Sequence, residues 1–179
     1  MQSRANLVLL LGGPAGGKTS FLQAGLEAKL QKIAQAKAEE IYSTRITGTE
    51  LYELVRSYGM ASAMRQWVMP AFPSAVGNEK IESQKEKDNE IFSFYEYVLR
   101  LFRIEAATHK IKSSGERKKK IVMILDDIDV LIASDSQSND IVFKILTYLI
   151  RLEEFAEIAV VISLNLENWM LLELSLIHI

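Results

Sequence analysis

The segment GGPAGGKT, residues 12–19, constrains the fold of this chain more than any other stretch. It matches the pattern G-x-x-x-x-G-K-[ST], in which glycines let the backbone close around an anion. A short apolar run precedes it, and apolar residues at helical spacing follow it. A buried strand, a glycine-rich turn and a helix in this order predict a phosphate-binding loop, because successive backbone N–H groups and the helix N-terminus then face the same anion.

The side chains of this loop predict the phosphates of ATP and a magnesium ion as ligands. Lys18 is expected to reach the β- and γ-phosphates, and the hydroxyl of Thr19 is expected to bind Mg²⁺. The expected cofactors are therefore ATP and Mg²⁺. The residues expected to hold the nucleotide are Gly12, Gly13, Pro14, Ala15, Gly16, Gly17, Lys18, Thr19 and Ser20.

Strand patterns alternate with helix patterns along the rest of the chain. Short apolar runs predict buried strands at residues 7–11, 121–125 and 158–164, and more weakly at residues 41–46. Helical periodicity covers residues 18–38, 91–102 and 141–155. This alternation predicts an α/β fold, a three-layer α/β/α P-loop NTPase sandwich with a mostly parallel sheet.

Two shorter features complete this outline. Thr49 is expected to cap a helix that carries apolar residues at Leu51, Leu54, Val55 and Tyr58. Residues 79–90 are charged and poor in apolar side chains, and they are expected to form an exposed loop or insertion.

Composition excludes several other classes of protein. With 179 residues, 49% of them hydrophobic and 25% charged, the chain is long enough and apolar enough for one globular domain. The absence of cysteine rules out a disulfide framework and a thiolate zinc site. No apolar run reaches the length of a membrane span, so we expect an intracellular protein with no membrane partner.

The last residues are expected to lie outside the domain. Residues 174–179, LSLIHI, match the translation of a sequencing adaptor in one reading frame. We therefore expect residues 1–173 to form one P-loop ATP-binding domain, truncated at its C-terminal end, and residues 174–179 to be a sequencing-adaptor scar.

Acidic residues end the strand predicted at residues 121–125. Asp126 follows the last apolar residue, and ligands bind at the carboxyl ends of parallel strands, so Asp126 is expected to hold Mg²⁺. Asp127 is either a catalytic acid that orients water or a helix-capping acid. Because Asp is one methylene shorter than the Glu usual in hydrolytic relatives, slow turnover is expected. Asp129 is expected to be a solvated loop acid.

A polar residue also ends the last predicted strand. Asn165 lies 39 residues after Asp126, with one predicted helix between them. It is either a catalytic sensor of the γ-phosphate or a residue of the turn that ends the strand. A strand, an acid, a helix, a strand and a polar residue in this order are typical of ATPases that activate water.

Beyond the loop, the chain resembles the AAA+ ATPases of the replication initiator group, most closely the subunit 5 family of the origin recognition complex. Three stretches carry the resemblance: the aromatic helix FSFYEYVLRLF at residues 92–102, the strand KIVMILDDIDVL at residues 120–131, and residues 151–169, from Arg151 through a strand to Trp169. The similarity covers most of residues 7–172.

This resemblance implies a role for the matching positions. Residues 12–19 would cradle ATP, Asp126 would hold magnesium and Asn165 would be the first sensor. It also implies a nuclear complex of several AAA+ subunits that acts on DNA in replication initiation, with ATP mainly stabilising the assembly and hydrolysis weak or absent. The helical lid, the second-sensor arginine and the DNA-binding winged-helix domain of such proteins have no counterpart in this sequence.

Two other classes stay open. A signalling ATPase of the STAND type often carries an acid cluster like that of residues 126–129, DDID. A nucleotide kinase shares the opening GGPAGGKT, but its lid needs clustered arginines, and the arginines here are scattered.

Overall fold

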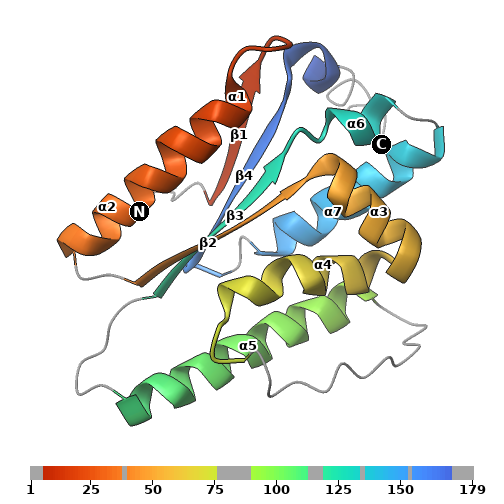
Figure 1. Ribbon diagram of the computed structural model, residues 1–179. Helices are drawn as coiled ribbons and strands as arrows, with labels where there is room; N and C mark the ends of the chain where they lie inside the picture. The colour runs from red at the N-terminus through yellow and green to blue at the C-terminus, as the bar shows by residue number, and fades with distance from the viewer. Residues whose placement is uncertain are drawn as a thin grey trace, which may run out of the picture.

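The computed structural model describes residues 6–37, 40–75, 90–112, 119–133, 136–152 and 155–170. Within them, all strands belong to one parallel sheet in the order β1-β4-β3-β2. The strands are β1 (Leu7–Gly12), β2 (Glu40–Thr47), β3 (Lys119–Asp126) and β4 (Ile158–Asn165), as Figure 1 shows. All four predicted strands are present, including the weakly predicted β2.

The loop-bearing helix covers one face of this sheet. It runs without a break through α1 (Lys18–Ser20), η1 (Phe21–Glu27) and α2 (Ala28–Lys37), as predicted, although the sequence did not indicate that η1 is π-helical. Its apolar side packs against β3 and β4 through a small cluster of buried residues, Leu22, Val122, Ile124 and Val161.

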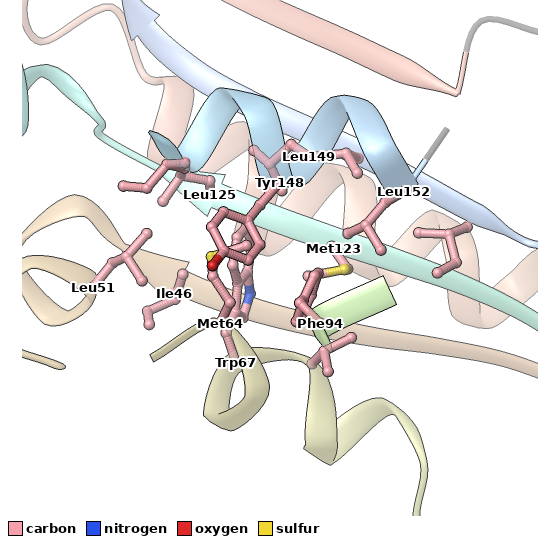
Figure 2. Close-up of a cluster of buried hydrophobic side chains, with 14 of the residues drawn as sticks. Ile46, Leu51, Met64, Trp67, Phe94, Met123, Leu125, Tyr148, Leu149 and Leu152 are labelled. Carbon is pink, nitrogen blue, oxygen red and sulfur yellow. The ribbon is translucent and has the colours of Figure 1, made fainter. Parts of the chain in front are cut away.

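The other helices cover the opposite face. They are α3 (Gly48–Tyr58), α4 (Met60–Val68), the 3₁₀ turn η2 (Met69–Ala71), α5 (Glu90–Lys112), α6 (Asp129–Ala133) and α7 (Ser136–Leu152). Figure 2 shows side chains of α4, α5 and α7 meeting those of β3 in the larger core.

The alternation of side chains along β3 explains the three layers. Ile121, Met123 and Leu125 face the larger core, whereas Val122 and Ile124 face the loop-bearing helix. A strand that is apolar on both sides must be covered on both faces, which is why its sequence is a continuous apolar run. The predicted α/β/α sandwich with a parallel sheet is confirmed.

Two predicted helix ends are wrong by a few residues. Thr47, rather than Thr49, caps α3: its hydroxyl accepts from the backbone N–H of Glu50 at 3.2 Å, and the Glu50 carboxylate accepts from the Thr47 backbone N–H at 2.8 Å. This reciprocal pair is a capping box. Helix α7 ends at Leu152, and Phe155, which was predicted within it, is buried beyond its end.

Some predictions fall outside the described residues. Residues 79–89 of the predicted loop lie there, and so do residues 174–179 of the suspected scar. In the part of the chain that the structure describes, no helix has the length and apolar character needed to span a membrane.

Candidate functional site

The carboxyl ends of the parallel strands meet the glycine-rich loop at a cavity of about 420 Å³. Residues of the loop, of the start of the helix that follows it and of the ends of β3 and β4 line it: Pro14, Ala15, Gly16, Gly17, Lys18, Thr19, Ser20, Asp126, Asp127, Ser163 and Asn165. All residues predicted for the site line this cavity except Gly12 and Gly13, which contribute backbone carbonyls just behind it. The volume is within the range of small-molecule sites.

The loop itself is tightly turned. Gly17 has φ 72° and Ala15 has φ 55°, so both adopt the left-handed conformation. That conformation is rare for a non-glycine residue such as Ala15, and such outliers concentrate at ligand-binding loops. The N–H of Gly16 donates to the carbonyl of Gly13 at 3.1 Å, and a Cβ on Gly16 would lie only 3.0 Å from that oxygen. A side chain at position 16 would therefore crowd the turn, which favours glycine there.

Lys18 is held over the loop by three acceptors. Its Nζ donates to the carbonyls of Gly12 and Gly13 at 3.2 and 3.0 Å and to Oδ1 of Asn165 at 2.6 Å. An ammonium group has three donors, so all are used. Because β4 pairs with β1, Asn165 is the register partner of Gly12, which brings the predicted sensor next to the predicted phosphate lysine.

Asp126 is buried among hydroxyl groups and one guanidinium. Its side chain is 1% exposed. Oδ1 accepts from Ser163 Oγ at 2.6 Å and from Thr19 Oγ1 at 3.3 Å, whereas Oδ2 lies 3.5 Å from Nη1 of Arg45. The two predicted magnesium ligands, Thr19 and Asp126, thus lie side by side at the base of the cavity.

This pair fits Mg²⁺ that arrives with a nucleotide. Magnesium takes oxygen ligands, keeps several waters and is usually held by one or two protein groups together with substrate phosphates. Within the described ranges, no group of three or more His, Cys, Asp and Glu side chains is placed to hold a metal. Thr19 and Asp126 would therefore supply only part of a coordination shell, which phosphate oxygens and waters would complete.

Asp127 turns the chain sharply after β3. Its φ is 55°, and its backbone N–H donates to Ser163 Oγ at 2.9 Å. Partial burial, a hydrogen bond with the Asp129 side chain and the charges of Asp129 and Asp126 raise the pKa of Asp127, while the charge of Lys18 acts in the opposite direction. The carboxyl group lines the cavity and shares a hydrogen bond with Asp129.

Asp129 is not the solvated loop acid that was predicted. It is 7% exposed, and its carboxylate accepts from the Asn165 backbone N–H at 2.8 and 2.9 Å and from Asn168 Nδ2 at 2.7 Å. The carboxylate therefore anchors the end of β4 to the start of α6. By fixing the Asn165 backbone, Asp129 directs the Asn165 side chain toward Lys18.

Sequence reasoning missed Arg45 and Gly48. Arg45 stands near the end of the otherwise uncharged stretch IYSTRIT, and that isolated charge was the available indication. Gly48 follows β2, where a Cβ would lie 2.4 Å from the carbonyl oxygen of Asp127. Glycine at this position lets α3 begin directly against the acidic turn.

Comparisons with known proteins found distant structural similarities. No protein-family model matches the chain, and the search of curated proteins returned no match. The Aeropyrum pernix ORC1 protein, solved in complex with DNA, aligns at 17% identity and a TM-score of 0.42 over 88% of this chain and 32% of its own. The KaiC-like protein PH0186 of Pyrococcus horikoshii aligns at 18% identity and a TM-score of 0.37 over 89% and 62%. The chain thus spans about a third of the first structure and under two thirds of the second.

Proposed function

We propose that this chain binds Mg-ATP in the cavity at the carboxyl edge of its sheet. One observation carries the proposal: at the start of α1, Lys18 lies against the loop carbonyls and Thr19 lies 3.3 Å from the buried Asp126. A cation for the phosphates and a hydroxyl–carboxylate pair for the metal are therefore adjacent. Their spacing suits the phosphate chain of a nucleoside triphosphate and its magnesium ion.

The proposed roles follow from this arrangement. Residues 12–20 cradle the phosphates, with Lys18 as their cation, and Thr19 and Asp126 hold Mg²⁺. Asn165 senses the γ-phosphate through its contact with Lys18. Asp127 is the candidate for orienting water, but its short side chain already hydrogen-bonds Asp129, so hydrolysis is proposed to be slow or absent.

At the finer level, we propose an AAA+ subunit of an origin recognition complex that acts in DNA replication initiation. The support is the sequence resemblance, together with the placement of β4 between β1 and β3, which brings Asn165 beside Lys18. In this role, bound ATP stabilises the contacts with other AAA+ subunits. DNA is contacted through the complex, which acts in the nucleus.

Titration of the purified protein with ATP and Mg²⁺ by calorimetry tests the nucleotide site. We expect a dissociation constant of about 10 μM or lower and a loss of at least about thirtyfold in Lys18→Ala, because charge-assisted contacts to phosphate disappear. Lys29→Ala removes an exposed lysine from α2 and serves as the matched control. Failure of the unaltered protein to bind, or equal binding by Lys18→Ala, contradicts the proposed site.

Phosphate release measured on the same samples tests the assembly role. We expect fewer than about one turnover per minute, well below the usual range for enzymes. Hydrolysis of several ATP molecules per second would contradict the proposal that ATP acts mainly as a structural ligand. Phosphate transfer to a nucleoside monophosphate would instead identify a nucleotide kinase.

A further inference from the structure

Arg45 places a positive charge on the carboxylate proposed to hold magnesium, and neither the loop motif nor the resemblance assigns it a role. Its Nη1 lies 3.5 Å from Oδ2 of Asp126, the oxygen opposite the one that Ser163 and Thr19 contact. The Arg45 side chain is 28% exposed, whereas that of Asp126 is 1% exposed. Asp126 lines the cavity and the ion pair is partly buried, so solvent screens it less than an ion pair at the surface.

A second residue fixes the guanidinium in this position. With its side-chain amide oxygen turned toward Arg45, Gln23 accepts from Nη1 at 2.6 Å and from Nη2 at 2.9 Å. Gln23 lies in η1, the π-helical segment that directly follows α1, and π-helical turns are frequent at functional sites. Arg45 thus connects the loop-bearing helix to the end of β3 across the sheet.

The charges around the cavity suggest a role for the Arg45 guanidinium. Asp126, Asp127 and Lys18 line the cavity, so its wall carries two carboxyl groups and one ammonium group. A nucleoside triphosphate brings several further negative charges to the same place. Without a metal, the carboxylate of Asp126 repels those charges unless another cation offsets it, and the guanidinium of Arg45 is positioned to do so.

We propose that Arg45 substitutes for part of the magnesium charge, so that the site binds ATP in the absence of metal and gains only moderately when Mg²⁺ is added. The inference rests on the proposed ATP site and concerns its dependence on metal. When Mg²⁺ is present, it neutralises Asp126 and the phosphates itself, so the contribution of Arg45 becomes smaller. Arg45 is therefore expected to affect metal-free binding more than metal-bound binding.

Calorimetric titrations of ATP in excess EDTA and in excess Mg²⁺ test this difference. For Arg45→Gln, which keeps much of the volume and removes the charge, we expect about a tenfold loss of affinity in EDTA and no more than about threefold in Mg²⁺. Arg45→Lys keeps the charge but loses the two-donor contact with Gln23, so its loss of affinity in EDTA is expected to be smaller than that of Arg45→Gln. Arg103→Gln removes an exposed charge from α5 and is the matched control.

The outcomes separate this inference from the proposed function. If the unaltered protein binds no ATP even with Mg²⁺, the proposed site itself fails. If it binds ATP and Arg45→Gln loses affinity equally in both conditions, or in neither, the role of Arg45 is overturned while the site stands. The role of Arg45 is also overturned if Arg45→Lys loses as much ATP affinity in EDTA as Arg45→Gln does, because the charge would then not be the cause of the loss. Thermal unfolding of each ligand-free variant verifies that it is folded.

Discussion

Oδ1 of Asn165 lies 2.6 Å from Nζ of Lys18, although 147 positions separate the two residues. The amide is neutral, so a phosphate oxygen can replace it as the acceptor for the ammonium group. A carboxylate at this position would instead form an ion pair with Lys18 and repel the phosphate. We expect Asn165→Asp to weaken ATP binding by at least about tenfold and Asn165→Ala by no more than about fivefold, as measured by calorimetry. Equal affinities for the two variants would contradict this explanation.

Gly48 is expected to be intolerant of any side chain. A Cβ there would lie 2.4 Å from the backbone oxygen of Asp127, which cannot move without shifting the acidic turn. We expect Gly48→Ala to lower the free energy of unfolding by about 1–3 kcal/mol, the usual range for overpacking, in urea unfolding experiments. Thr49→Ala changes the neighbouring exposed residue and should stay within about 0.5 kcal/mol. A Gly48→Ala protein as stable as the original would show that the turn can yield.

The capping box at Thr47 should contribute measurably to stability. Removing its hydroxyl leaves the Glu50 backbone N–H without its acceptor at the start of α3. We expect Thr47→Ala to cost about 1 kcal/mol, and its comparison with Thr49→Ala by thermal unfolding distinguishes the two candidate caps. A larger loss in Thr49→Ala would contradict the assignment of Thr47 as the cap.

The pH dependence of stability should report on Asp127. Its pKa is raised by partial burial and by Asp129, so the folded protein holds this proton more tightly than the unfolded chain does. This tighter proton binding adds its full contribution to the free energy of unfolding below the ordinary aspartate pKa of about 4. The contribution is lost as the pH rises through the higher pKa of the folded state. We expect Asp127→Asn to raise the Tm at neutral pH and to change it little near pH 3.5. An increase in Tm of the same size at both pH values would show that the raised pKa of Asp127 is not the cause.

The loop and the three strongly apolar strands could be predicted because the information is local. Residues 7–20 contain a strand, a turn and a helix start in uninterrupted order, and each pattern depends only on its neighbours. The runs that became β3 and β4 are apolar on both sides, which only a strand covered on both faces requires. The position of Asp126 then followed from the rule that parallel strands end at one edge.

The contacts that depend on strand order could not be predicted in the same way. Arg45 reaches Asp126 because β2 lies beside β3, and Ser163 reaches it because β4 lies on the other side. Hydrophobic periodicity identifies strands but does not order them. The prediction for Asp129 was wrong for a related reason, because its burial depends on a backbone N–H of β4 that is distant in sequence.

The insertion of β4 between β1 and β3 also has a consequence for how the chain folds. Strand β1 has no hydrogen-bonded partner among the described strands until β4 arrives, since its register pairs Leu7 with Val160 and Gly12 with Asn165. Such non-local pairing raises the contact order and slows folding. The N-terminal half of the chain contains the glycine-rich loop but lacks the strand that holds it in place. The proposed nucleotide site is therefore complete only late in folding. If the chain binds ATP as proposed, the ligand is expected to favour the fully assembled sheet over partly folded forms.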